Sequence, residues 1–133
     1  MKPDYRQEAR RWFRQAESDL DDARFVLQGG RYSLTCFLCQ QAAEKALKGL
    51  LYRSGAEDVW GHSVADLCHD AAKSFHDIES LVGDCASLDK YYIPTRYPDS
   101  LPGGIPAEAF DKFDAERAME LAQKVLDEVR RWL

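Results

Sequence analysis

The chemically richest stretch of the sequence is YYIPTRYPDSLPGGIP, in which one arginine, one aspartate and three tyrosines lie among four prolines. Arg96 and Tyr97 could bind a nucleotide or RNA, because a guanidinium pairs with phosphate and an aromatic ring stacks on a base. The same stretch also suits a structural role, in which Pro98 sets a turn, Asp99 bonds to local backbone, and Arg96 binds a carboxylate or the last carbonyls of the preceding helix. The sequence leaves both roles open.

A second group of polar residues falls on one strip of an otherwise apolar helical stretch: Gln40, Gln41, Glu44, Lys45 and Lys48. The last four of these are candidate site residues. Glu44 and Lys48 are four residues apart, so they could form a solvated ion pair that contributes only about 0.3 to 0.5 kcal/mol. Alternatively, the strip packs against the proline-rich loop. In that arrangement Glu44 holds Arg96, and Lys45 or Lys48 lies beside Asp99.

His62 is the third candidate for chemistry. It directly precedes Ser63, which together with Asp66 is typical of the start of a helix. A histidine at this position most simply braces the loop before the helix. An imidazole there could also accept or donate a proton near neutral pH.

The four cysteines predict buried thiols and no metal site. Cys36 and Cys39 form a C-x-x-C pair, but the pair lies inside an apolar helical pattern. No second such pair, and no histidine pair at the spacing of a zinc site, accompanies it. Cys68 and Cys85 are isolated, and small buried thiols are typical of a reducing compartment. We expect no metal and no other cofactor.

Length and composition indicate one small cytoplasmic domain over residues 1–133. The chain is 45% hydrophobic and 31% charged, and a chain of 133 residues buries about two thirds of its surface on folding. No apolar run reaches the roughly 20 residues that span a bilayer, and the start lacks the apolar core of a signal peptide. The net charge of -5 argues against a broad basic surface for nucleic acid, although a small basic pocket remains compatible with it.

Apolar residues recur at helical spacing in five segments, and no segment alternates as a strand would. The predicted helices cover residues 4–27, 32–54, a short stretch from Ser63, 78–92 and 106–133. Pro94 is expected to end the fourth, and the fifth is expected to present Phe110 and Phe113 among its apolar residues. The sequence therefore predicts an all-α fold, an antiparallel up-and-down bundle of four to five helices.

The second predicted helix is apolar over more than half of its circumference, at Leu38, Cys39, Ala42, Ala43, Ala46, Leu47, Leu50 and Leu51. Such a helix needs packing partners on more than one side. Either it lies at the centre of a bundle, or its extra apolar arc meets another subunit. The pattern favours neither alternative.

Three segments together resemble the HEPN family of helical, nucleotide-associated domains: QQAAEKALK at residues 40–48, GHSVADL at 61–67 and YYIPTRYPD at 91–99. The resemblance spans nearly the whole chain, with the segments in the family's order. It implies a mainly antiparallel helical bundle that forms homodimers. It also implies that the chain is one half of a two-gene toxin and antitoxin pair, because such proteins are often encoded beside a small nucleotidyltransferase.

Several members of that family are metal-independent ribonucleases with an R-x(4-6)-H motif at the dimer interface. Cleavage through the 2′-hydroxyl needs a proton-transfer group near neutral pH and a cation for the developing negative charge. This sequence departs from the motif, because Leu101, Pro102 and Gly103 stand where a histidine would follow Arg96. Eight residues separate Arg53 from His62, which is also outside the spacing.

The resemblance therefore implies a dimeric HEPN protein without the usual catalytic pair. We expect a non-catalytic component that binds a nucleotide, RNA or a nucleotidyltransferase partner and does not bind a membrane. The alternative is a metal-independent ribonuclease toxin that uses a non-standard site around Arg96 and His62.

Overall fold

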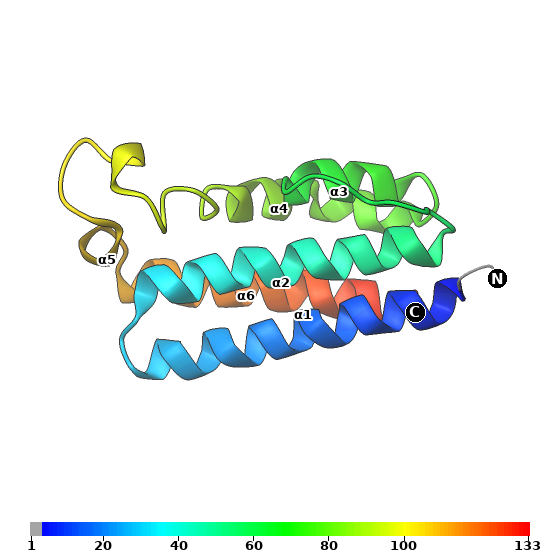
Figure 1. The fold of residues 1–133 in the computed structure, drawn as a ribbon, viewed down its shortest axis with the longest axis horizontal. Helices are drawn as coiled ribbons and strands as arrows, with labels where there is room; N and C mark the ends of the chain where they lie inside the picture. Colours follow the sequence, from blue (N-terminus) through cyan, green and yellow to red (C-terminus); the bar gives the residue numbers. More distant parts are fainter. Residues whose placement is uncertain (1–3) are drawn as a thin grey trace.

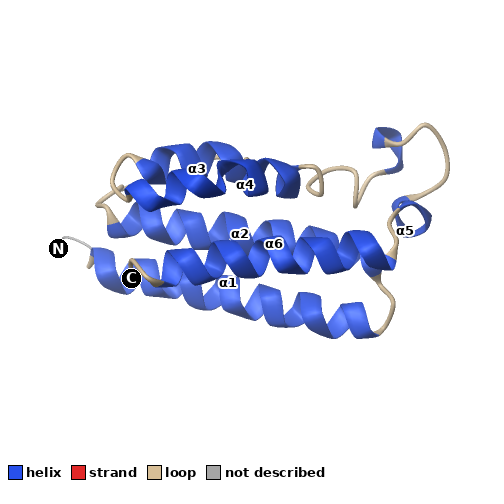
Figure 2. Cartoon of the chain, turned by 180° about the vertical axis from the view of Figure 1, so that it is seen from behind, coloured by secondary structure: helices blue, strands red, loops and turns tan. Residues whose placement is uncertain are grey.

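Three long helices form the body of the protein (Figures 1 and 2). The computed structural model describes residues 4–133, and within that part of the chain it contains helices and loops and no strand. α1 (Tyr5–Gln28) and α2 (Tyr32–Arg53) form an antiparallel hairpin, and α6 (Lys112–Arg130) packs against both. α3 (Val64–Ala72) and α4 (Val82–Asp89) lie against α2 on the side away from α1. The predicted all-α bundle is confirmed.

The helix starts predicted from local sequence are confirmed. The Asp4 carboxylate accepts hydrogen bonds from the backbone N–H groups of Arg6, at 3.0 Å, and Gln7, at 3.3 Å. Ser63 Oγ accepts one from the N–H of Asp66 at 3.1 Å, at the start of α3. These bonds satisfy N–H groups that have no partner inside the helix.

The segment predicted as one helix over 78–92 is shorter and has two parts. A 3₁₀ helix, η1 (His76–Leu81), leads into α4, and the chain leaves the helix at Lys90, before Pro94. The predicted end is wrong, because the backbone N–H groups of residues 90–92 bond to carbonyls three residues earlier, as in turns, and not four residues earlier, as in an α-helix. The apolar seam is nevertheless buried as expected at Ile78, Leu81, Cys85 and Leu88.

The helix predicted from Pro106 to the end of the chain is broken. α5 (Pro106–Ala109) is a single turn, and α6 begins anew because Asp111 and Asp114 each accept the other's backbone N–H, at 2.9 and 3.0 Å. This reciprocal cap is stable at a helix start and ends α5. Phe110 packs edge-on against Tyr91. Phe113 was predicted to lie in the core, but its side chain is 77% exposed.

α2 is the central helix of the bundle. Its small residues Ala42, Ala43 and Ala46 are fully buried within one chain, and a Cβ added at Gly49 would lie 3.0 Å from the Ala9 carbonyl oxygen. The wide apolar arc is therefore filled by α1, α6 and the layer of α3 and α4. A second subunit would have to use a different surface.

The four cysteines are buried free thiols. Cys39 Sγ lies 3.4 Å from the Met119 sulfur, and Cys68 Sγ donates to the carbonyl of Ile78 at 3.2 Å. Burial raises the pKa of Cys36 to about 12. Within residues 4–133 no three histidine, cysteine or acidic side chains are grouped as metal ligands, and no helix is long and apolar enough to cross a membrane.

Candidate ligand-binding site

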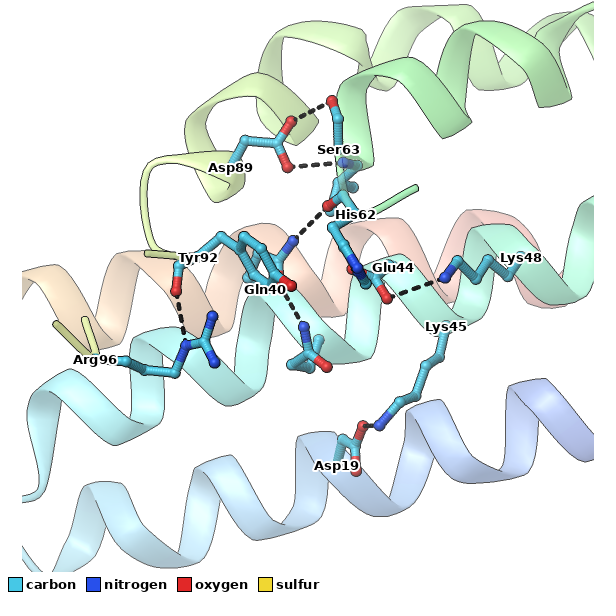
Figure 3. A network of polar contacts seen from close by, with 12 residues as sticks. Asp19, Gln40, Glu44, Lys45, Lys48, His62, Ser63, Asp89, Tyr92 and Arg96 are labelled. Atoms are coloured by element: carbon cyan, nitrogen blue, oxygen red, sulfur yellow. Dashed lines mark hydrogen bonds and ion pairs between the residues drawn. The ribbon is translucent and has the colours of Figure 1, made fainter. Parts of the chain in front are cut away.

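Arg96 is held by aromatic rings and a backbone carbonyl (Figure 3). Its Nε donates to the carbonyl of Tyr92 at 3.0 Å, which lies just beyond the end of α4. The guanidinium carbon lies 4.4 Å from the ring centre of Phe37, 4.8 Å from that of Tyr92 and 5.1 Å from that of Tyr97. Arg96 is exposed, and within residues 4–133 its two terminal nitrogens have no partner. These nitrogens are therefore available to bind an anion.

The contact predicted between Glu44 and Arg96 is wrong. Glu44 binds Lys48 Nζ at 3.3 Å through one oxygen and faces His62 Nδ1 at 3.2 Å through the other (Figure 3). Arg96 instead lies over Phe37, seven residues earlier on α2, which is about 10 Å along the helix axis. The end of α4 places the loop at the level of Phe37, too far along α2 for a bond to Glu44.

The ion pair of Glu44 and Lys48 is buried, although the spacing alone suggested a solvated pair. The Glu44 side chain is 5% exposed and that of Lys48 is 9% exposed. Lys48 also lies 5.8 Å from the ring centre of Trp12 on α1. Lys45 reaches Asp19 of α1, so the predicted placement of a lysine beside Asp99 is wrong. Glu44 and Lys48 of this polar strip are thus packed inside the protein, and Lys45 is partly buried against α1.

His62 lies on the same aromatic ring as Arg96. Its imidazole stacks on Tyr92 with 5.0 Å between ring centres, and the side chain is 60% exposed. Because Nδ1 faces the Glu44 carboxylate, Nε2 is left for a ligand. The structure therefore brings His62 and Arg96 to one ring within a single chain, although they are far apart in the sequence.

Two residues that were not among the predicted site residues, Gln40 and Asp89, fix the loop that carries His62. The Gln40 side chain on α2 donates to the His62 carbonyl at 2.8 Å and accepts from Gln41 at 2.8 Å. Asp89 accepts from Ser63 Oγ at 2.9 Å and from the N–H groups of Val64 and Ala65 at 2.7 and 3.1 Å. A carboxylate at the start of α3 is favoured by the helix dipole.

Gln40 had one signal in the sequence, because it is the polar residue next to Gln41 in an apolar stretch. Asp89 had none, since it lies 24 to 26 residues from its partners. Asp19 on α1 is a buried polar residue that also had no signal in the sequence, and it binds both Lys45 and Gln15. Such residues are visible only once the helices are packed.

Thr95, and not Arg96, is the buried brace of the proline-rich loop. Its side chain is 6% exposed, and its hydroxyl donates to the carbonyl of Tyr91 at the end of α4. Asp99 is exposed in the short 3₁₀ turn η2 (Pro98–Ser100), and Tyr97 is 50% exposed. Burial raises the pKa of Tyr91 beneath this loop. The three site residues predicted in this loop, Arg96, Tyr97 and Asp99, are thus exposed.

The comparison with family models decides the family, because the HEPN domain model matches residues 9–132. The chain belongs to the HEPN family. A Thermus thermophilus protein, TT1696, has a crystal structure that superimposes with a TM-score of 0.90 at 46% identity, covering 95% of this chain and 98% of that one. The archaeal HEPN homologue ST0689 gives a TM-score of 0.78 at 37% identity, covering 99% and 98%.

Among curated proteins, this HEPN chain is 27% identical to “Putative toxin MJ1304” of Methanocaldococcus jannaschii, over 94% of this chain and 88% of the relative. The family and the fold that the sequence resemblance implied are confirmed.

The arrangement of the site suits binding of a phosphate group beside an aromatic ring. A guanidinium with two free terminal nitrogens matches two phosphate oxygens, and the half-exposed Tyr97 offers a face on which a base can stack. His62, an imidazole backed by a carboxylate, stacks on the same Tyr92 ring that Arg96 contacts. Binding and proton transfer are both within the chemistry of these groups.

Proposed function

We propose that this HEPN protein is a non-catalytic, phosphate-binding component of a toxin and antitoxin module, with a nucleotide or RNA as its ligand. The observation that carries the proposal is the state of Arg96. Three aromatic rings and one carbonyl hold its guanidinium, and its terminal nitrogens have no partner in the described part of the chain. An arginine that only braced a loop would direct those nitrogens to a carboxylate.

In this proposal Arg96 binds the phosphate and Tyr97 stacks on the base. The overall charge of -5 repels polyanions at long range, so binding depends on the local site. Each phosphate contact on a single strand contributes a slope of about -0.7 to the dependence of log K on log salt. A shallow salt dependence is therefore expected.

We further propose that two chains associate through the face that carries this site. Apolar side chains stay exposed there: Leu34 at 44% and Ile93 at 41%, close in sequence to Phe37 and Arg96. A stable interface covers about 800 Å² on each partner. A partner on this face would enclose the ligand between subunits, and a small nucleotidyltransferase is the second partner that we propose for the module.

Binding of fluorescein-labelled single-stranded RNA, followed by anisotropy, tests the ligand proposal. Arg96→Ala should weaken binding by about tenfold or more, because a charge-assisted bond is lost. Arg131→Ala at the far end of α6 is the matched control and should bind as the parent protein does. Equal binding by the parent, Arg96→Ala and Arg131→Ala would contradict the proposal.

A specific observation favours a second function, a metal-independent ribonuclease. Glu44 orients His62, and His62 shares Tyr92 with Arg96, which puts a proton-transfer group near a cation. The test is RNA cleavage in the presence of a chelator. Cleavage that disappears in His62→Ala but persists in His69→Ala would establish the ribonuclease. If the parent protein does not cleave RNA, the ribonuclease function is excluded and the binding function is retained.

A further inference from the structure

A second basic cluster lies at the opposite end of the bundle from the proline-rich loop. A pocket of about 250 Å³ is lined by Arg6, Arg10, Arg53 and Leu133. It lies where α1 begins and where α2 and the C-terminal stretch after α6 end, close to the N and C labels in Figure 1. Nothing in the proposed function uses these three arginines.

The positions of Arg6 and Arg10 are electrostatically unfavourable in the protein alone. They are four residues apart on α1, and like charges at this spacing repel each other. Arg6 lies in the first turn of the helix, where the positive end of the helix dipole disfavours cations. Arg53, in the last turn of α2, adds a third positive charge to the same pocket.

None of the three arginines forms an ion pair or a side-chain hydrogen bond within residues 4–133. Two carboxylates lie near Arg6 in sequence. Asp4 is directed to the start of α1, where it accepts from the backbone N–H of Arg6 at 3.0 Å. Glu8 accepts from Arg11 at 2.8 Å and from Trp12 Nε1 at 3.2 Å. Both carboxylates thus have partners other than the guanidinium groups of the pocket.

We propose that this pocket binds a phosphate group carrying two negative charges. A guanidinium can donate two parallel hydrogen bonds to phosphate oxygens, and three guanidinium groups line this one space. The volume is below the roughly 300 to 1,000 Å³ of pockets that enclose a whole organic ligand, so a small anion such as phosphate suits it. Sites at which a protein retains unfavourable local charge are typically functional.

The phosphate could be free in solution or could be the terminal phosphate of an RNA. These two sources present the same phosphate group to the pocket, and two titrations distinguish them. The first titration uses inorganic phosphate. The second titration compares a dinucleotide that carries a 5′-phosphate with the same dinucleotide without it.

The experiment is isothermal titration calorimetry on the full chain in an Arg96→Ala background, which removes the proposed site in the loop from the measurement. We expect binding of one phosphate per chain. Arg10→Gln should weaken it by about tenfold or more, since a charge-assisted hydrogen bond corresponds to at least that change in Kd. Arg131→Gln, an exposed arginine outside the pocket, is the control and should bind normally.

A thermal melt without phosphate gives an independent check. Because Arg10 is repelled by Arg6, Arg10→Gln should raise the melting temperature of the free protein. Absence of phosphate binding, or equal binding by Arg10→Gln, would overturn the proposal. So would a lower melting temperature for free Arg10→Gln, since that would identify Arg10 as a structural brace.

Discussion

The buried ion pair of Glu44 and Lys48 gives the sharpest test of how α2 is held in the bundle. Glu44→Gln keeps the size of the side chain but removes its charge, and it leaves the Lys48 ammonium without a counter-ion. The two side chains are 5% and 9% exposed, so water cannot replace the lost carboxylate. Removing one partner of a buried pair costs about 3 to 5 kcal/mol.

The expected loss for Glu44→Gln lies near the low end of that range, at about 3 kcal/mol. Lys48 has a flexible stem that can extend toward water, and it keeps the ring of Trp12 at 5.8 Å. The contact of Glu44 with His62 adds little, because the histidine side chain is 60% exposed and solvated. Since whole domains are stable by only about 5 to 15 kcal/mol, the change is large.

Urea unfolding followed by far-UV circular dichroism measures this loss. The double variant Glu44→Gln/Lys48→Met removes both charges, so it should recover most of the stability that Glu44→Gln loses. Glu17→Gln is the matched control, because Glu17 binds Arg130 in a pair that is about half exposed and should lose at most about 0.5 kcal/mol. A loss below about 1 kcal/mol for Glu44→Gln, or strict additivity in the double variant, would refute this reasoning.

Three further predictions concern the rest of the molecule. Arg96→Ala should lower the free energy of unfolding by only about 1 kcal/mol, because it loses an exposed hydrogen bond and exposed cation–π contacts. A urea titration measures this change, and a loss above about 3 kcal/mol would mean that the arginine is structural. Asp89→Ala should cost about 1 to 2 kcal/mol and loosen the start of α3, seen as faster amide hydrogen exchange at Val64 and Ala65 than in the parent protein. The cysteines should react with a thiol reagent at pH 8 only after unfolding, since all four are buried and burial raises the pKa of Cys36 to about 12. Fast labelling of the folded protein would contradict this prediction.

Local sequence was enough to predict where the first three helices begin and that the fold is all-α. These features depend on groups a few residues apart. Asp4 and Ser63 cap the N–H groups that follow them, and Gly30, at a φ of 74°, permits the tight turn between α1 and α2. The apolar period of the helices also showed many of the residues that are buried, although it was wrong for Phe113. Local interactions of this kind do not depend on how the helices are packed.

The breaks in the last two predicted helices were less visible in the sequence. The reciprocal cap of Asp111 and Asp114 is local, but the continuous apolar pattern from Pro106 concealed it. α4 ends at Asp89, whose side chain bonds to the start of α3, more than 20 positions away. The sequence near Asp89 gives no signal of these tertiary bonds.

The contacts within the candidate site follow from the packing of the helices. The sequence supplied the residue types Arg96, His62 and Glu44, but it could not assign their partners. The packing of α4 on α2 places the loop beside Phe37, which gives Arg96 aromatic neighbours and leaves Glu44 to Lys48 and His62. Helix spacing fixes which residues share a face, whereas the axial offset between two packed helices fixes which faces meet, and that offset depends on the whole core.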